Sequence, residues 1–327
     1  MVELKPVVFV TRRIPEPGLD MLREVCEVVV NNEDRVLSKQ EIIEGVKGKD
    51  ALLCLLTDKI DAEVMDAGSN LKVIANYAVG FDNIDIEAAT ARKIPVTNTP
   101  GVLTETTADF AFALLMCAAR RVVEADRFTR EGKYKGWAPM LLLGCDVYGK
   151  TLGIVGFGRI GEAVARRAKG FSMRVIYYDE RRRSPEEEKR LGVEYVPFST
   201  LLAESDFISI HVPLMPSTYH MFGAAEFAAM KNTAILINTA RGPVVDEEAL
   251  VEALRKREIA GAGLDVYEDE PMLKPGLIDL DNVVLAPHIA SASVETRTKM
   301  ATMAAENVLA ALRGEVPPNI VNRKVFE

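Results

Sequence analysis

Residues 151–161, TLGIVGFGRIG, decide the fold of the second half of this chain. The apolar run 152–155 has the length and composition of a buried strand, and a G-x-G-x-x-G pattern follows it directly. Apolar residues then recur at helical spacing from Ile160 to Phe171. A strand, a glycine-rich turn and a helix in this order predict the pyrophosphate-binding turn of a doubly wound dinucleotide-binding sheet. The candidate cofactor-binding residues of this turn are Gly156, Phe157, Gly158, Arg159, Ile160 and Gly161.

The acidic residue at the end of the next strand indicates which dinucleotide binds. Asp179 ends the strand-like run RVIYYD, about 20 residues beyond the first glycine, where a carboxylate can accept hydrogen bonds from the adenosine ribose. The same carboxylate would repel a 2′-phosphate, which favours NAD. Arg181, Arg182 and Arg183 follow in the next loop, and guanidinium groups can bind a phosphate. The sequence therefore predicts that NADH is preferred, with NADP as the alternative, and adds Glu180, Arg181 and Arg182 to the candidate cofactor contacts.

Outward from this turn, strand-like and helix-like segments alternate along the chain. The first half repeats the rhythm from residues 7–10 onward, and Ser38 with Glu41 has the spacing of a capping box at a helix start. Longer helical patterns run from residue 104 to about 132 and from residue 293 to about 313. Such alternation predicts an α/β protein with mostly parallel sheets. The strand-like segments of the second half are TLGIVG, RVIYYD, FISIHV, AILINT, AGAGLDV and NVVLAPH.

Composition and charge restrict the class of protein. The chain has 327 residues, enough for two domains, and 48% of them are hydrophobic, as in soluble globular proteins. With 40 basic and 48 acidic residues, the net charge of −8 argues against a generic nucleic-acid or acidic-membrane binder. No cysteine or histidine spacing predicts a metal site, and no apolar run has the length of a membrane span or signal peptide. The sequence predicts a cytoplasmic protein.

Three residues that could carry chemistry follow strand-like segments of the second half. Arg241, Glu270 and His288 stand at or just beyond the ends of the last three of these segments. Because parallel strands end at one edge of a sheet, these side chains should approach one another and the dinucleotide. Hydride transfer to a 2-oxo acid needs such a set. An arginine can hold the carboxylate and polarise the carbonyl, a protonated histidine can donate a proton, and a carboxylate can orient that histidine.

Taken together, these motifs resemble the D-isomer-specific 2-hydroxyacid dehydrogenase family over essentially the whole chain. The stretch around Trp137, GWAPMLLLGCDVYGKT, is similar to the glyoxylate/hydroxypyruvate reductase branch, especially its archaeal members. The segments that carry the resemblance are NYAVGFDNID (76–85), NTPGVLTETTADF (98–110), GKTLGIVGFGRIG (149–161), HVPL (211–214), INTARG (237–242), AGLDVYEDEP (262–271) and APHIAS (286–291).

The resemblance implies two Rossmann-like domains with the active site in the cleft between them. A smaller, flavodoxin-like substrate domain would comprise residues 1–99 and 287–327, and the NAD(P)-binding Rossmann domain residues 100–286. The helix from Thr104 is similar to the family's dimer-interface element, so a homodimer through the cofactor domain is expected. The expected partners are a small 2-oxo or 2-hydroxy acid and a second copy of the chain, with no nucleic acid, membrane or metal ion.

The resemblance also assigns roles to individual residues. It implies that Arg241, Glu270 and His288 are the catalytic arginine, acid and histidine. The residues expected to bind the substrate are Leu55, Val79, Gly80, Arg241 and His288. The further residues expected at the cofactor are Thr104, His211, Val212, Pro213, Thr218, Thr239, Ala240, Arg241, Asp265, His288 and Ala290.

The reaction implied is hydride transfer from NAD(P)H to a small 2-oxo acid, from glyoxylate to glycolate and from hydroxypyruvate to D-glycerate. D-3-phosphoglycerate dehydrogenase is the nearest alternative enzyme. Formate dehydrogenase fits less well, because that branch uses glutamine where Glu270 stands. The alternative from a different class is an NAD-sensing, corepressor-like binding protein of the C-terminal-binding type, which shares the fold and the catalytic residues. Turnover of glyoxylate with NADH would separate the enzyme from the binding protein.

Overall fold

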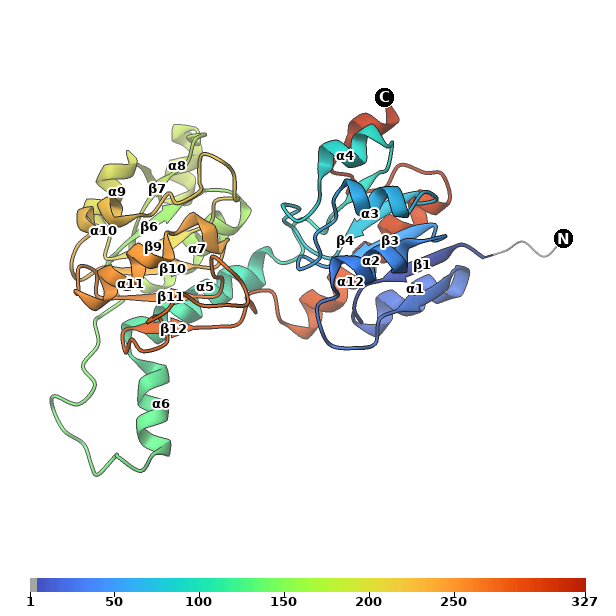
Figure 1. The fold of residues 1–327 in the computed structure, drawn as a ribbon. Helices are drawn as coiled ribbons and strands as arrows, with labels where there is room; N and C mark the ends of the chain where they lie inside the picture. The colour runs from blue at the N-terminus through green and yellow to red at the C-terminus, as the bar shows by residue number, and fades with distance from the viewer. Residues whose placement is uncertain (1–4) are drawn as a thin grey trace. The chain divides into compact units, whose positions relative to one another are not determined.

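The computed structural model describes residues 5–327, and the chain divides into two units. Unit 1 is formed by the chain up to Leu103 together with Ala292–Glu327, and unit 2 by Thr104–Ser291. Each unit is built on one parallel sheet with helices on both faces (Figure 1). The chain passes between the units twice, after Leu103 and after Ser291, whereas the expected boundaries lay after residues 99 and 286.

The sheet of unit 1 has the flavodoxin-like strand order β2-β1-β3-β4-β5. Successive residues of a strand face opposite sides, so Val8 and Val10 join one apolar core while Phe9 joins the other. The strands are β1 (Val7–Val10), β2 (Glu27–Val30), β3 (Ala51–Cys54), β4 (Val73–Asn76) and β5 (Val96–Thr97). The helices are α1 (Glu16–Val25), α2 (Lys39–Val46), α3 (Ala62–Ala67), α4 (Ile86–Ala91) and α12 (Val294–Leu312).

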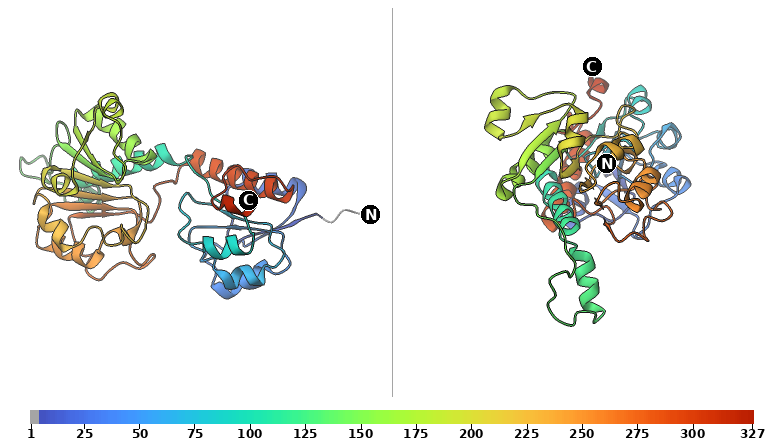
Figure 2. Two further views of the ribbon diagram at one scale, coloured as in Figure 1. Left: turned by 90° about the horizontal axis from the view of Figure 1, so that it is seen from above. Right: turned by 90° about the vertical axis from the view of Figure 1, so that its left-hand side faces the viewer.

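Helix α12 comes from the far end of the sequence and covers one face of this sheet beside α1 (Figure 2). The two helices pack closely because α1 carries Gly18, where a Cβ atom would lie 2.7 Å from backbone atoms of Ala301. Leu19, Leu22 and Ala304 are buried in the same core. Unit 1 is therefore completed by a helix that follows unit 2 in the chain.

The sheet of unit 2 has seven parallel strands in the order β12-β11-β10-β9-β6-β7-β8. The order reverses between β6 and β9, and doubly wound sheets bind their ligands at such a switch point. Six strands were expected; β8 was missed because two residues are too short to show a periodic pattern. The strands are β6 (Thr151–Val155), β7 (Arg174–Tyr178), β8 (Glu194–Tyr195), β9 (Phe207–Ile210), β10 (Ile235–Asn238), β11 (Gly261–Leu264) and β12 (Val283–Leu285).

The expected long helix from residue 104 to about 132 is wrong, because it is two helices. The break falls at Arg121, whose φ is 52°, and the amide of Cys145 donates to the carbonyl of Ala119 that ends the first helix. Short 3₁₀ helices lie at Lys169–Phe171, Gly242–Val244 and Arg323–Phe326. The α-helices of unit 2 are α5 (Thr104–Ala119), α6 (Val122–Arg130), α7 (Arg159–Ala168), α8 (Pro185–Leu191), α9 (Phe198–Glu204), α10 (Ala224–Ala229) and α11 (Glu247–Arg255).

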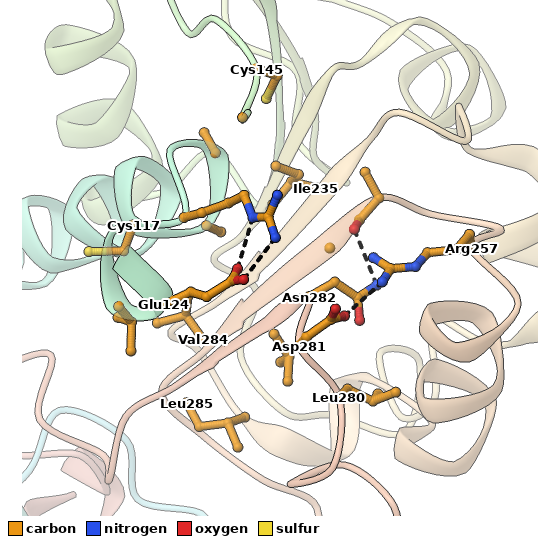
Figure 3. A pocket seen from close by; sticks show the side chains of 18 of the residues that line it. Cys117, Glu124, Cys145, Ile235, Arg257, Leu280, Asp281, Asn282, Val284 and Leu285 are labelled. Atoms are coloured by element: carbon orange, nitrogen blue, oxygen red, sulfur yellow. Dashed lines mark hydrogen bonds and ion pairs between the residues drawn. The ribbon is translucent and has the colours of Figure 1, made fainter. Parts of the chain in front are cut away.

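Helix α6 and the loop of residues 131–147 extend away from the sheet of unit 2 and are called the arm below (Figure 1). No residue of α6 is buried, and Trp137 and Met140 are 83% and 76% exposed. A cavity of about 580 Å³ lies where the base of the arm meets the edge strand β12, bordered by the ion pairs Arg121–Glu124 and Arg257–Asp281 (Figure 3). Within residues 5–327, no helix is both long enough and apolar enough to cross a bilayer.

Candidate active site

The glycine-rich turn between β6 and α7 has the geometry of a phosphate cradle. Gly156 has a φ of +91°, and a Cβ there would lie 2.6 Å from the backbone carbonyl carbon of His211. A Cβ at Gly161 would collide with the carbonyl oxygen of Gly156, so this glycine allows helix and strand to touch. A Cβ at Gly158 would meet nothing within 4 Å, which leaves open space in front of the α7 N-terminus. The free N–H groups of that helix end can face a pyrophosphate there.

Asp179 lies beside this turn, and its carboxylate has protein partners of its own. Its Oδ2 accepts a hydrogen bond from the Phe157 amide at 2.6 Å, and its Oδ1 accepts one from the Arg181 amide at 2.9 Å. The carboxylate therefore ties the glycine-rich turn to the end of β7. It keeps further lone pairs, since a carboxylate can accept about four hydrogen bonds.

The three consecutive arginines after Asp179 are not equivalent. Arg182 donates two hydrogen bonds to Glu188, both at 2.9 Å, and lies over the ring of Tyr195. Arg183 donates to the carbonyl of Phe157 at 3.1 Å. Arg181 is exposed, and within the described part of the chain its side chain forms no ion pair that would compete with a phosphate. Only one of the three thus has its guanidinium available, which the sequence could not distinguish.

The segment after β9 packs against the glycine-rich turn at Gly156. The amide of His211 donates to the carbonyl of Val155 at 2.7 Å, and its Nε2 lies 2.8 Å from the buried Ser209 hydroxyl. Desolvation lowers the pKa of His211 to about 3, so the ring is neutral. Thr218 donates its hydroxyl hydrogen to the carbonyl of Pro213 at 2.6 Å, which fixes the loop that also carries Val212. These expected cofactor residues lie together at the carboxyl end of β9.

Arg241 follows β10 on a loop whose backbone is held firmly. The Asn238 side chain donates to the Arg241 carbonyl at 3.0 Å and accepts from the Ala240 amide at 3.0 Å. A Cβ at Gly242 would collide with the carbonyl of Tyr267, so this loop packs directly on the one after β11. Thr239 is buried, and its hydroxyl finds no hydrogen-bond partner within the described residues. An unsatisfied buried hydroxyl beside the switch point is consistent with a ligand that supplies the partner.

Glu270 and His288 form a direct pair. Nδ1 of His288 lies 2.8 Å from Oε2 of Glu270, and Oε1 of Glu270 accepts from the Tyr267 amide at 3.0 Å. Burial raises the pKa of Glu270, but the hydrogen bond and charge of His288, the Tyr267 amide and the charge of Arg241 outweigh it, so the pKa lies below 4.5. The carboxylate is therefore ionised at neutral pH, and all three expected catalytic residues share one region of unit 2.

Asp265, at the end of β11, holds the loop that carries His288. It is fully buried, and its two oxygens accept hydrogen bonds from the amides of Ile289 and Ala290, each at 2.7 Å. Burial raises the pKa of this carboxyl group. His288 itself has a φ of 55°, a backbone conformation that needs such support. The sequence interpretation placed Asp265 only near the cofactor and did not foresee this role.

Tyr267 is a site residue that the sequence analysis missed. Its amide holds Glu270, and its hydroxyl donates to the carbonyl of Ala286 at 2.8 Å, just before His288. It therefore links the two loops of the pair. Its position inside DVYEDEP was the available signal, but a tyrosine next to a strand ordinarily indicates only packing.

The expected substrate residues Leu55, Val79 and Gly80 belong to unit 1. They follow β3 and β4 and thus lie at the carboxyl edge of that sheet. The amide of Leu55 donates to Asp58 at 2.8 Å, while the carbonyls of Val79 and Gly80 accept from asparagine side chains at 2.7 and 2.9 Å.

Thr104, an expected cofactor residue, is the first residue of α5 in unit 2. Among residues 5–327, no group of three or more His, Cys, Asp or Glu side chains could hold a metal ion.

Comparison with known proteins identifies close relatives. The family model described as D-isomer specific 2-hydroxyacid dehydrogenase, NAD binding domain, matches residues 112–290. The glyoxylate reductase of Korarchaeum cryptofilum is 63% identical over 326 residues, which is 99% of this chain and 98% of the relative. That of Thermococcus litoralis is 56% identical over 327 residues, again 99% and 98%.

Solved structures of other proteins share the fold of this chain. A protein of Thermus thermophilus has a TM-score of 0.91 and 49% identity, with 96% of this chain and 99% of that chain covered. An NADPH-dependent glyoxylate/hydroxypyruvate reductase of Sinorhizobium meliloti, solved with NADP and malonate, has a TM-score of 0.86 and 34% identity, with 98% of each chain covered.

Proposed function

The chain belongs to the D-isomer specific 2-hydroxyacid dehydrogenase family, and on that premise we propose that it is a glyoxylate reductase that also reduces hydroxypyruvate. It is an oxidoreductase that transfers a hydride from NAD(P)H to a small 2-oxo acid. The products are glycolate and D-glycerate. The observation that carries the proposal is the 2.8 Å pair of Glu270 and His288 in the same region of unit 2 as Arg241.

The roles of the three residues follow from their chemistry. When bound, NAD(P)H supplies the hydride that reaches the carbonyl carbon. His288 presents Nδ1 to Glu270, so Nε2 is the nitrogen that donates a proton to the carbonyl oxygen. Glu270 stays ionised and orients the imidazolium, which ends the step as neutral imidazole. Arg241 binds the substrate carboxylate and polarises the carbonyl, since a guanidinium matches both oxygens.

The cradle at the α7 N-terminus would hold the pyrophosphate of the cofactor, Asp179 would accept hydrogen bonds from the ribose, and Thr239 would lie near the nicotinamide. NADH is the preferred reductant, because the Asp179 carboxylate disfavours a 2′-phosphate. Two observations support the binding of a dinucleotide here. The Asp179 carboxylate can still accept further hydrogen bonds, and the space in front of Gly158 is open. Leu55, Val79 and Gly80 bind the substrate from unit 1. The cytoplasm, where both reductants are available, is the location that suits this activity.

The active assembly is a homodimer formed through unit 2. The arm supports this, because its helix buries none of its residues within one chain and its loop exposes Trp137 and Met140. Strand β12 is the edge of its sheet, and apolar residues such as Leu285 line the cavity beside it. Monomeric proteins rarely leave such apolar surface open. A second copy of the same chain is the partner that this surface fits.

The test is the initial rate of glyoxylate reduction by the purified protein with NADH and with NADPH. We expect turnover with both, a higher kcat/KM with NADH, and a loss of roughly 10²- to 10⁴-fold in His288→Ala, the range of a missing general acid. Cofactor binding, followed by fluorescence, should survive in the variant. A wild type that binds NADH but reduces no 2-oxo acid would favour a binding protein instead.

A further inference from the structure

Glu268 is a largely buried carboxylate two residues before Glu270, and the reaction steps described above do not use it. Its side chain is 13% exposed. Its Oε1 lies 2.9 Å from Nε2 of His220, and its Oε2 accepts a hydrogen bond from the Glu247 amide at 3.3 Å. The ammonium group of Lys274, later in the same loop, lies 3.7 Å from Oε2. A carboxylate with so little access to water depends on these partners.

The partners of Glu268 come from the loops that carry the expected active site. His220 lies in the segment after β9, which also carries expected cofactor contacts. Glu247 is the first residue of α11 and follows the loop after β10 that carries Arg241. Glu268 itself lies in the loop after β11, together with Glu270. A single side chain therefore joins three neighbouring strand ends of the unit 2 sheet.

The backbone of these loops is held in an unusual conformation at both ends of the network. His220 has a φ of 50° and His288 a φ of 55°, and residues other than glycine keep such angles only where their surroundings hold them. The His220 amide donates to the Pro243 carbonyl at 2.8 Å. Two of the three histidines of the chain thus have a positive φ, and each contacts a carboxylate of the same loop, Glu268 or Glu270.

We propose that Glu268 is a positioning residue for the proton donor. By binding His220 and the Glu247 amide, it fixes the loop after β11 against the loops after β9 and β10. The fixed loop holds Glu270 where its carboxylate orients the imidazole of His288. Glu268 acts through Glu270, and the proposal rests on the proposed function, because the rate that it affects is that of 2-oxo acid reduction.

The first test is a double-mutant cycle on kcat for glyoxylate reduction at saturating NADH. A catalytic group misplaced by about 1 Å can cost about 10²-fold, so Glu268→Ala should lower kcat by about 10- to 100-fold. In a Glu270→Ala background the same change should alter kcat by about 2-fold or less, because the group that Glu268 positions is already missing. Glu268→Gln keeps an oxygen for the Glu247 amide and should restore most of kcat. Equal losses with and without Glu270 would refute the proposal.

Two further variants control this cycle. Glu204→Ala removes an ion pair with Arg174 at 2.6 Å, elsewhere in unit 2, and should leave kcat unchanged. A loss equal to that of Glu268→Ala would mean that the general stability of unit 2 is the cause. His220→Asn removes the imidazole but tolerates a positive φ. If Glu268→Ala does not fold, His220→Asn replaces it in the cycle, and a kcat unchanged by His220→Asn would then refute the proposal.

A second measurement is independent of turnover. Because the chain has three histidines, their ring signals in proton–carbon NMR spectra can be assigned by replacing His211, His220 and His288 in turn. Glu268→Ala should shift the signal of His220, its direct partner, and also that of His288, whereas Glu204→Ala should shift neither. An unmoved His288 signal in Glu268→Ala would refute the positioning role. A wild type that reduces no 2-oxo acid refutes the proposed function instead, and the spectra still decide whether Glu268 positions His288.

Discussion

At the scale of single residues, the contact between Glu270 and His288 is expected to orient the imidazole for proton donation. Nδ1 of His288 lies 2.8 Å from the carboxylate, which leaves Nε2 for the carbonyl oxygen of the substrate. Glu270→Gln keeps the shape but removes the charge. We expect kcat for glyoxylate reduction to fall in Glu270→Gln, by less than the roughly 10²- to 10⁴-fold loss of a missing general acid. The rate is measured at saturating NADH, and an unchanged kcat in Glu270→Gln would refute the paired mechanism.

The same carboxylate makes a pH-dependent contribution to stability. Its folded-state pKa lies below 4.5, so ionised Glu270 stabilises the folded state above that pH, and the contribution is lost as pH falls through the folded-state pKa. We expect the Tm difference between wild type and Glu270→Gln to be constant near neutral pH and to shrink below about pH 4.5. Thermal unfolding from about pH 7 to about pH 3 measures it. A Tm difference that grows as the pH falls would contradict the lowered folded-state pKa of Glu270.

We expect the cofactor preference to depend on Asp179 and Arg181. Asp179→Asn removes the charge but keeps an oxygen that can accept from the Phe157 amide, so the glycine-rich turn should persist. We expect the preference for NADH, expressed as a ratio of kcat/KM values, to fall about 10-fold or more, as for one lost charge repulsion. In the Asp179→Asn background, adding Arg181→Ala should lower kcat/KM for NADPH again, because it removes the available guanidinium. Adding Arg183→Ala should leave kcat/KM for NADPH unchanged. A wild type that prefers NADPH would overturn the role of Asp179.

These residues also show what the sequence could not reveal. The pattern predicted the loops that carry Arg241, Glu270 and His288, because strand ends and turn glycines are local signals. The partners of the arginines are not local, since Arg182 meets a carboxylate on α8 and a ring on β8. No spacing rule encodes which of three neighbouring arginines stays available.

At the scale of elements, α1 and α12 depend on the close approach at Gly18. An added methyl group would meet the Ala301 backbone at 2.7 Å, and the two helices would have to separate. We expect Gly18→Ala to lower the free energy of unfolding by about 1–3 kcal/mol, the range for overpacking. Urea unfolding measures the loss. Gly170→Ala is the matched control, because a Cβ there meets nothing within 4 Å, and an equal loss in both variants would mean that packing is not the cause.

Elements with strong local signals were predicted correctly from the sequence. The capping box of Ser38 and Glu41 is present at the start of α2, and Ser293 caps α12. The break between α5 and α6 was not predictable, because it depends on the loop returning from residue 145 to the end of α5. The apolar pattern continues across the break, since the exposed residues Val122 and Val123 look like core residues in the sequence.

At the scale of the whole molecule, the arm determines the expected assembly. The double variant Trp137→Asp, Met140→Asp would place negative charge on the surface proposed to contact a second copy of the chain. We expect this double variant to sediment as a monomer while the wild type sediments as a dimer. Val316→Asp adds a charge to an exposed residue of unit 1 and should leave the dimer intact. A wild type that is monomeric at micromolar concentration would contradict the dimer.

The late position of α12 affects how this protein is made. During translation, the first 103 residues leave the ribosome without the helix that covers one face of their sheet, and all of unit 2 is synthesised before that helix appears. Unit 2 is continuous in sequence and can fold as soon as it emerges. The nascent N-terminal sheet, in contrast, must wait with an apolar face uncovered, which is a surface that chaperones bind. Folding on the ribosome should therefore run against the order of synthesis, and the N-terminal sheet should become protease-resistant only after α12 has left the ribosome.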